Sequence, residues 1–488
     1  MGVLLVNIHR DPGELAGPYH RLMARMPPIT LAYLAAALEA DGVPVAVHDD
    51  DAFDGDDGAL RQAIRRARPS LVGVSLVTAA AAGLPRVVRI VREEAPNARI
   101  VAGNIHAEIY HRPLLEAGAL DIVSHGEGER TLVELARAVD AGTPLDDVKG
   151  LSFLRGGEVV QTPPRPLIED LDTLPFPAWH LLPMDRYRIF GFAKVRDPGI
   201  LVLGSRGCPF SCAFCSLKVM GPRRRVRSVV NIADECEWDL ERFGYVQPSF
   251  VDALFPLSKK EGLAYAAELV RRGLHRKQVW VTETRVESVD LELLQALRES
   301  GLRRIMFGIE SGDAADLATL RKSASLDATR KAIEASRKAG VETIGFFILG
   351  IPGATRQSME GDLRLSRELD LDFAKYTCFV PYPGTPIHDD LARKGELRDP
   401  GNWRGYTLYP SRENPPVYLA KGLTVDDLVR LQARAHLEFY LRPRMIARQV
   451  LRIRTLSVQD LVQHAQSAAT AALAALRSRR RAGASGGA

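Results

Sequence analysis

Short apolar runs alternate with amphipathic segments along the first third of the chain. The apolar runs predict strands at residues 3–8, 43–47, 71–76, 99–102 and 122–123. The segments between them carry apolar residues at helical spacing and predict helices at residues 28–40, 60–68, 84–95 and 114–117. Alternating strands and helices indicate an α/β fold with a doubly wound parallel sheet. Such a sheet binds ligands beyond the carboxyl ends of its strands.

A second series of strands and helices runs from Ile200 to about Thr385. Its apolar runs predict six strands, at residues 200–203, 249–252, 280–285, 306–311, 344–350 and 375–378. Six parallel strands with helices outside them form a partial barrel. Polar residues at the carboxyl ends of these strands then converge on one mouth, so we expect a site there.

Two further stretches differ from these series. Residues 146–196 are rich in proline, which stiffens a linker, and they predict a connector. Beyond about Asp399 the apolar spacing is helical, at residues 425–440, 444–452 and 458–476. The sequence therefore predicts a Rossmann-like domain at 1–145, the connector at 146–196, a partial (β/α)6 TIM-like barrel at 197–398, a helical region at 399–476 and a disordered tail at 477–488.

Composition limits the partners and the location that we expect. Of the 488 residues, 46% are apolar and 26% are charged, which is ordinary for a water-soluble protein. The net charge of +5 is small for this length and gives little support for nucleic-acid binding. No apolar run reaches the roughly 18 residues of a membrane span, so we expect a cytoplasmic protein. The basic, amphipathic stretch from Arg444 to Arg454 allows peripheral membrane contact, although packing on a neighbouring domain is the commoner use of such a helix.

Three of the five cysteines lie close together, directly after the apolar run at residues 200–203. They are Cys208, Cys212 and Cys215, on a loop interrupted by glycine. Closely spaced thiolates on such a loop can face one side of a four-iron cluster and leave one iron open to a chelating small molecule. A zinc site is the alternative, but no fourth Cys or His lies between Ser216 and Asp234. A disulfide is disfavoured because cysteine is scarce in the chain.

The spacing Cys-x3-Cys-x2-Cys after a buried strand, with Phe214 just before the last cysteine, resembles the signature of the radical S-adenosylmethionine enzymes. The resemblance implies that the three cysteines hold a 4Fe-4S cluster and that S-adenosylmethionine is the chelating molecule. It also implies a one-electron reductant, such as a flavodoxin-like protein, as a partner. Strand ends of the predicted barrel match the family's cofactor-binding segments. By this resemblance, the residues assigned to S-adenosylmethionine are Phe214, Asp252, Arg285, Glu310, Ser311, Ile348 and Gly350.

Strand ends of the first domain resemble, in combination and order, the cobalamin-binding domain that precedes the barrel in many of these enzymes. The residues that are assigned to cobalamin by this resemblance are Ser75, Thr78, Gly103, Asn104, Gly126 and Glu127. The first three are implied to face the nucleotide tail of the corrinoid, and Asn104 stands where the family usually has glycine. The Asp-x-His-x2-Gly motif, which ligates cobalt in other corrinoid proteins, is absent. We therefore expect no protein ligand to cobalt, and structural roles for His106 and His125.

Together the resemblances imply a cobalamin-dependent radical enzyme that acts on a small molecule. The leading expectation is methylation of an unactivated carbon, or of phosphorus, through a 5'-deoxyadenosyl radical and methylcobalamin. The runner-up is an oxidative cyclase or rearrangement enzyme that transfers no methyl group, and a non-catalytic iron-sulfur sensor or corrinoid carrier is a third alternative. The sequence does not identify acid or base residues at the substrate site. Cys378 is a candidate hydrogen donor, although a buried and inert cysteine is the commoner case.

Overall fold

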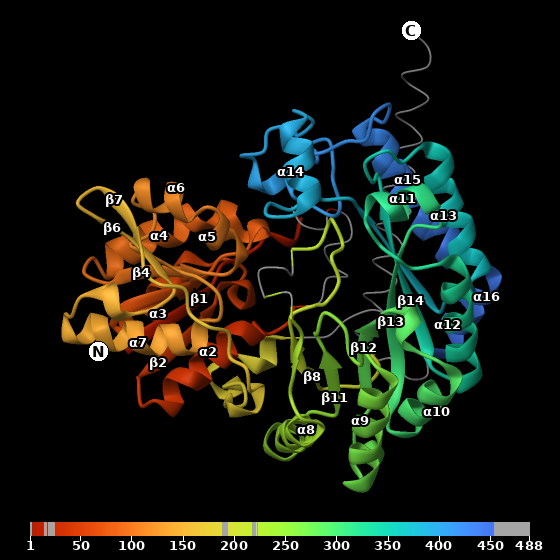
Figure 1. The fold of residues 1–488 in the computed structure, drawn as a ribbon, viewed down its shortest axis with the longest axis horizontal. Helices are drawn as coiled ribbons and strands as arrows, with labels where there is room; N and C mark the ends of the chain where they lie inside the picture. Colours follow the sequence, from red (N-terminus) through yellow and green to blue (C-terminus); the bar gives the residue numbers. More distant parts are fainter. Residues whose placement is uncertain are drawn as a thin grey trace.

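The computed structural model describes residues 2–13, 17, 25–187, 194–216, 221 and 223–452. Two α/β units lie side by side, and Figure 1 shows the first in red to yellow and the second in green to cyan. Their sheets have seven and six strands. A segment drawn in blue follows the second unit and places helix α14 (Pro386–Arg393) between the two units at one end.

The sheet of the first unit has the strand order β2-β1-β3-β4-β5-β6-β7. The strands are β1 (Gly2–Asn7), β2 (Val45–Asp49), β3 (Pro69–Ser75), β4 (Arg99–Gly103), β5 (Ile122–Ser124), β6 (Leu151–Arg155) and β7 (Glu158–Gln161). The first five pair in parallel, which confirms the predicted doubly wound sheet. Their apolar runs are nearly continuous because a parallel sheet of this kind is buried on both faces.

Helices cover both faces of this first sheet. They are α2 (Ile29–Ala40), α3 (Asp57–Ala67), α4 (Leu84–Glu94), α5 (Ile105–Ile109), α6 (His111–Glu116) and α7 (Gly128–Ala141). Alternate residues of β1 point to opposite faces. Val3 and Leu5 belong to the apolar cluster of α2 and α7, whereas Leu4 and Val6 belong to the cluster of α3 and α4. The unit therefore has three layers, with two cores separated by the sheet.

Strands β6 and β7 lie within residues 146–196, the stretch that the sequence predicted as a proline-rich connector. β6 pairs antiparallel with β5, and β7 pairs antiparallel with β6, so the first sheet continues to Gln161. Gly156 and Gly157 join the two strands, and their φ angles of 60° and 87° suit a tight hairpin turn. A Gly-Gly pair between two short apolar runs is a hairpin signal. The prolines that follow dominate the composition of the segment and hid that signal.

The sheet of the second unit has six parallel strands in the order β15-β14-β13-β12-β11-β8. They are β8 (Gly199–Val202), β11 (Gln247–Phe250), β12 (Trp280–Thr284), β13 (Leu302–Glu310), β14 (Glu342–Leu349) and β15 (Phe373–Cys378). The helices that connect them are α8 (Val229–Phe243), α9 (Lys259–Arg271), α10 (Leu291–Glu299), α11 (Ala314–Thr319), α12 (Leu326–Ala339) and α13 (Arg356–Glu368). Because β8 and β15 form opposite edges of the sheet, the barrel is open, which confirms the predicted partial barrel.

A small antiparallel ribbon follows β8 and leads into the cysteine loop. It consists of β9 (Ser205–Arg206) and β10 (Arg225–Val226). The ribbon brings the two ends of the 207–224 segment together. The cysteine loop is therefore anchored at both ends on the same side of the barrel.

The C-terminal helices pack on the barrel. In α15 (Val425–Tyr440), the side-chain amide of Gln432 donates to the backbone oxygens of Tyr376 (2.9 Å) and Leu408 (3.0 Å). The basic helix α16 (Pro443–Arg452) buries Met445 and pairs Arg444 with Asp370 at 2.8 Å. The predicted helix at 458–476 and the tail at 477–488 lie outside the described residues. Within the described ranges, no helix combines the length and apolar character needed to cross a membrane.

Candidate functional site

The cysteine loop leaves the carboxyl end of β8 and carries Cys208, Cys212 and Cys215. All three thiols are half-buried and none is in a disulfide. Gly207 precedes the first of them with a φ angle of 83°, and a Cβ atom there would lie 2.4 Å from the backbone oxygen of Arg223. Only glycine fits this turn, because it tolerates both the positive φ and the close backbone contact.

The donor set of this loop fits a four-iron cluster better than a single metal ion. Among the residues that the structure describes, no three Cys, His, Asp or Glu side chains gather around one ion-sized site. In a four-iron cluster each thiolate binds a different iron, so three cysteines on one loop have the chemistry that the cluster needs. The assignment of the cluster to these three residues stays a prediction.

The remaining two cysteines lie in apolar surroundings. Cys236 of α8 is buried next to the Tyr265 hydroxyl (3.7 Å), and burial raises the pKa of its thiol. Cys378 lies on the same face of β15 as Tyr376, opposite to Lys375 and Thr377, because strand residues alternate. Both Tyr376 and Cys378 are buried in the main apolar core, and burial raises the pKa of the Cys378 thiol. The structure therefore places the candidate hydrogen donor away from the polar side of the strand.

Asp252 connects the end of β11 to the start of the cysteine loop. Its carboxylate accepts hydrogen bonds from the Gly204 backbone N–H (2.9 Å) and from the Ser205 hydroxyl (2.5 Å). Burial raises the pKa of Asp252 to about 7, and these two hydrogen bonds partly oppose the rise. Both oxygens thus bind the protein itself, so the direct effect of Asp252 is to position the loop.

Four charged side chains on the barrel influence one another, and we call them the mouth charges: Glu283 on β12, Glu310 at the carboxyl end of β13, Lys322 between α11 and α12, and Lys375 on β15. Glu310 accepts from the ammonium of Lys322 at 2.6 Å, and its φ angle of 65° is in the left-handed region. A Cβ atom on Gly308 would lie 2.4 Å from the Glu310 carboxylate and 2.7 Å from the Lys322 ammonium, so a side chain there would displace the ends of both. Strained backbone of this kind is frequent at ligand sites.

The other two mouth charges have shifted pKa values. Burial raises the pKa of Glu283 to about 7, and the neighbouring carboxylate of Glu310 adds to the rise. Burial lowers the pKa of Lys375, and Glu283 opposes that change. The mouth therefore combines anionic and cationic groups at low solvent exposure, which suits a ligand that carries both signs of charge.

The remaining residues that were predicted for S-adenosylmethionine divide into two kinds. Ile348 is half-buried on the same face of β14 as Phe346, while Gly350 follows the strand with a φ angle of 77°. The guanidinium of Arg285 lies 4.1 Å from the centre of the Phe210 ring. Phe214 is half-buried and packs against the main core. By contrast, the Ser311 hydroxyl is fully buried and bonds to Asp362 at 2.8 Å, so it serves the protein's own polar network.

The carboxyl edge of the first sheet gathers small, uncharged groups. Ser75 and Gly103 are paired neighbours at the ends of β3 and β4. Asn104 follows with a φ angle of 79°, and its side-chain amide lies 3.3 Å from the Ser75 hydroxyl. Asparagine adopts this conformation more readily than most residues, so it can replace the glycine that the family usually has there.

His106 and Thr78 are buried at this edge, next to two aromatic rings. The Nδ1 atom of His106 lies 3.2 Å from the Thr78 hydroxyl, and both residues are buried. The ring of His106 contacts Tyr110 and Trp403, with centroids 4.7 and 4.6 Å away. Burial lowers the pKa of His106 to about 4, so the imidazole is neutral near pH 7. Trp403, which the sequence placed only in the C-terminal region, thus covers the first unit.

His125 and Gly126 end the same edge. His125 lies 2.7 Å from the Ser152 hydroxyl of β6, and burial lowers its pKa to about 4. The backbone N–H of Gly126 donates to the carboxylate of Glu108 at 3.0 Å. The contacts with Ser152 and Glu108 therefore fix the turn that precedes α7.

Glu127, which was predicted to contact cobalamin, belongs to a buried ion-pair network between the two units. We call this network the interdomain clamp: Glu127, Glu129, Arg206 and Arg225. Arg206 pairs with Glu127 at 2.9 Å and with Glu129 at 2.5 Å, and Arg225 pairs with Glu127 at 2.8 Å. Burial acts to raise the pKa of Glu127, but the hydrogen bonds from Arg225 and Arg206 outweigh it and lower the pKa. All four side chains are less than 10% exposed.

The clamp lies directly beside the cysteine loop, since Arg206 is two residues before Cys208. No periodic pattern connects positions 127 and 206, so the sequence did not predict the clamp. Sequence analysis also missed Glu283, Lys375 and Trp403. A lone charged residue in the otherwise uncharged strand β12 was the available signal for Glu283.

Comparison with known proteins adds two family matches and several relatives. The model of the radical SAM superfamily matches residues 202–366, and the model of the B12 binding domain matches residues 21–136. A Pyrococcus horikoshii protein named as an uncharacterized methyltransferase is 32% identical over 426 residues, which cover 87% of this chain and 90% of that protein. The anaerobic magnesium-protoporphyrin IX monomethyl ester cyclase of Rubrivivax gelatinosus is 30% identical over 410 residues, 82% of this chain and 71% of the cyclase.

Among solved structures, the radical S-adenosylmethionine methyltransferase TsrM of Kitasatospora setae, with cobalamin and a 4Fe-4S cluster bound, has a similar fold. The TM-score is 0.69 at 19% sequence identity, and the match covers 89% of this chain and 91% of TsrM. The match extends over both α/β units. The arrangement of the two sheets is therefore shared between the two proteins.

Proposed function

Because this chain belongs to the radical S-adenosylmethionine enzymes that carry a cobalamin-binding domain, we propose that it methylates an unactivated carbon, or phosphorus, of a small molecule. One observation carries the proposal: the cysteine loop at the barrel mouth is joined by the interdomain clamp to the unit that ends in the uncharged sheet edge. Two reactive centres can act on one substrate only if the protein holds their sites at a fixed separation.

The cofactors supply the hard chemistry when bound: the cluster and S-adenosylmethionine provide a substrate radical, and cobalamin provides the methyl group. In our proposal, Cys208, Cys212 and Cys215 hold the cluster. The mouth charges bind the amino acid part of S-adenosylmethionine, with the Glu310 carboxylate toward its ammonium group. Ser75, Thr78, Gly103 and Asn104 bind the corrinoid through hydrogen bonds, and the neutral His106 does not bind cobalt.

Burial of the clamp and of the aromatic cover supports the exclusion of water from the space around both centres. The clamp residues are nearly inaccessible to solvent, and Trp403 packs on His106 and Tyr110. A reactive radical needs such a closed environment because water and stray C–H bonds compete with the substrate. We propose that the C-terminal region from about Asp399 helps to cover the substrate, and that residues 1–145 and 197–398 carry the two cofactor-binding parts.

A second candidate is an oxidative cyclase or rearrangement enzyme that uses the same cofactors. The 30% identity to the Rubrivivax cyclase favours it, because that relative is nearly as similar to this chain as the one named a methyltransferase. Both candidates need the same cofactor sites. They differ only in the fate of the substrate radical.

Mass spectrometry of small molecules separates the two candidates. The purified protein, reconstituted with iron, sulfide and cobalamin, is incubated without oxygen with a small-molecule extract and methyl-deuterated S-adenosylmethionine. Methylation predicts a product that carries the deuterated methyl group. An unlabelled product lighter by two hydrogens would support the cyclase instead. The Cys208→Ala, Cys212→Ala, Cys215→Ala triple variant is the control, and we expect it to form neither product.

A further inference from the structure

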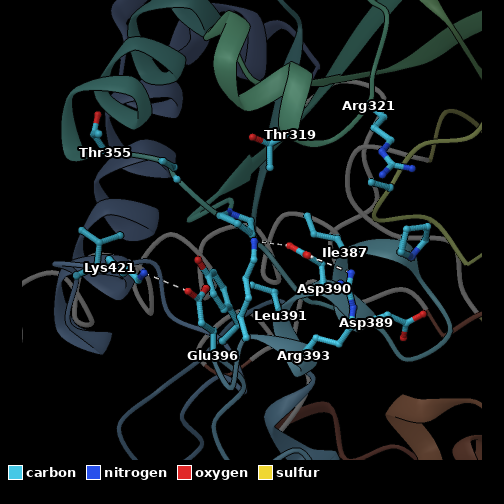
Figure 2. A pocket seen from close by; sticks show the side chains of 18 of the residues that line it. Thr319, Arg321, Thr355, Ile387, Asp389, Asp390, Leu391, Arg393, Glu396 and Lys421 are labelled. Atoms are coloured by element: carbon cyan, nitrogen blue, oxygen red, sulfur yellow. Dashed lines mark hydrogen bonds and ion pairs between the residues drawn. The ribbon is translucent and has the colours of Figure 1, made fainter.

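A pocket of about 950 Å3 lies beside the cysteine loop, and we propose that it is the docking site of an acidic one-electron carrier protein that reduces the cluster. The inference rests on the proposed function, since it needs a cluster on the loop. Figure 2 shows the pocket between α14, the end of α11 and the turn that follows β14. None of the residues predicted to bind S-adenosylmethionine or cobalamin lines it, so it is separate from the cofactor sites.

The cysteine loop itself forms part of the pocket wall. Ala213, between Cys212 and Cys215, lines the pocket. Its backbone N–H donates to the Leu320 oxygen (2.8 Å), and its carbonyl accepts from the Ile387 N–H (3.1 Å). Ile387 belongs to α14 and also lines the pocket. A single hydrogen bond therefore connects the pocket surface to the backbone between two predicted cluster ligands, which gives an electron a short route inward.

The rim of the pocket carries an excess of basic side chains. Five basic residues line it, namely Arg321, Arg356, Arg393, Lys394 and Lys421, against three acidic ones, namely Asp389, Asp390 and Glu396. Two of the acids are neutralised from within the rim. Asp390 pairs with both Arg393 (3.2 Å) and Lys394 (2.6 Å). Glu396 pairs with Lys421 (3.1 Å), as Figure 2 shows.

The basic groups also project further into solvent than the acids that they pair with. Arg393, Lys394 and Lys421 are 76%, 56% and 89% exposed, whereas Asp390 and Glu396 are 40% and 27% exposed. An approaching protein therefore meets positive charge first. Complementary charge chiefly raises the rate of encounter. Electron-transfer partners meet through small, transient interfaces, which a pocket rim of this size can supply.

The proposed step transfers one electron and nothing else. The carrier is oxidised by one electron and the cluster is reduced by one electron. No proton moves and no covalent bond forms or breaks. The carrier is defined by its chemistry, as an acidic protein with a one-electron centre near its surface.

Charge reversal on the rim tests the docking site. The reconstituted protein and its R393E/K394E/K421E variant are mixed with reduced flavodoxin at low salt, and cluster reduction is followed by the bleaching of its visible absorbance. Electrostatic steering changes association rates by roughly 10- to 1,000-fold, so we expect the second-order rate constant to fall by at least about tenfold. The control variant R330E/K331E/K338E makes the same charge change on α12, where all three residues are exposed and none lines the pocket. We expect it to keep the wild-type rate.

Two further measurements keep the result decisive. Titanium(III) citrate, a small reductant that needs no docking, should reduce all three proteins at the same rate. Carbodiimide cross-linking of wild-type protein to flavodoxin, mapped by mass spectrometry, should join flavodoxin carboxylates to Lys394 or Lys421. Equal flavodoxin rates in both charge variants would overturn the proposal, as would cross-links only at lysines outside the pocket. If titanium-reduced protein cleaves S-adenosylmethionine without methyl transfer, the proposed function fails while the docking site stands.

Discussion

The carboxyl edge of the first sheet and the mouth of the barrel are built in the same way, from polar groups at the ends of parallel strands, but they differ in charge. The edge offers hydroxyl, amide and glycine groups and a histidine whose pKa is lowered to about 4 by burial. The mouth holds two carboxylates and two ammonium groups at low exposure. The difference indicates a large, hydrogen-bonding ligand at the edge and a small, charged ligand at the mouth.

Removal of the three loop thiols should abolish the mouth's cluster and leave the edge unchanged. In the triple variant of Cys208, Cys212 and Cys215 to alanine, we expect no cluster absorbance after anaerobic reconstitution, with cobalamin still bound. The matched control is Cys378→Ala, which removes a buried thiol on the apolar side of β15 and should keep the cluster. Cluster absorbance that survives in the triple variant would contradict the assignment.

Breaking the clamp should weaken the connection between the two regions. Arg206→Ala leaves the buried Glu129 without this ion pair, and loss of one partner of a buried pair costs about 3–5 kcal/mol of the free energy of unfolding. Urea unfolding, followed by circular dichroism, measures the change. Arg412→Ala, which removes an exposed ion pair with Asp426, is the control and should cost far less, because solvent screens an exposed pair. Equal costs for the two variants would show that the clamp contributes no more than a surface pair.

Neutralising one mouth charge should affect the charged ligand alone. Glu310→Gln keeps the size of the side chain but removes the charge beside Lys322. We expect S-adenosylmethionine to bind roughly tenfold more weakly, or about 1.4 kcal/mol, by isothermal titration calorimetry. Cobalamin affinity should not change. Glu342→Gln provides the matched control, because Glu342 begins the neighbouring strand β14, whereas Glu310 ends β13. A loss of cobalamin binding in Glu310→Gln would break the distinction between the two regions.

The smallest expected effect is a pH dependence that distinguishes the two sites. The pKa of Glu283 is raised to about 7, so this carboxyl group loses its proton and becomes anionic as the pH rises from 6 to 8. Affinity for the sulfonium and ammonium charges of S-adenosylmethionine should therefore increase over this range, by a few-fold. In Glu283→Gln the affinity should be independent of pH. Cobalamin affinity should be constant in both proteins, because the pKa of His106 is lowered to about 4 and it stays neutral. A falling affinity for S-adenosylmethionine would contradict the assigned charge.

Local patterns in the sequence account for most of the fold. Apolar runs and helical spacing predicted both parallel sheets, because strand and helix periods can be read within a few residues. The β6–β7 hairpin was not predicted, although Gly156-Gly157 is a hairpin signal, because the following prolines indicated a linker. The cysteine loop was found from spacing alone. Its exact surroundings, such as the contact of Gly207 with Arg223, needed the structure.

The contacts between distant parts of the chain could not be predicted in the same way. Arg206 and Glu127 are 79 positions apart, and a buried charge pair has no sequence signature beyond two ordinary charged residues. The contact of Trp403 with His106 depends on how the C-terminal region folds back over the first unit. Both contacts join distant parts of the chain, so this part of the account comes from the structure.

The most direct test of the central claim needs no knowledge of the substrate. The reconstituted protein, with cobalamin bound and reduced, is incubated anaerobically with methyl-deuterated S-adenosylmethionine, and the extracted corrinoid is analysed by mass spectrometry. A cobalamin-dependent methyltransferase predicts that the deuterated methyl group appears on the cobalamin, and that it does not appear when the protein is left out of the mixture. Cleavage of S-adenosylmethionine to 5'-deoxyadenosine with no labelled corrinoid would contradict methyl transfer and assign the chain to the cyclase-like enzymes.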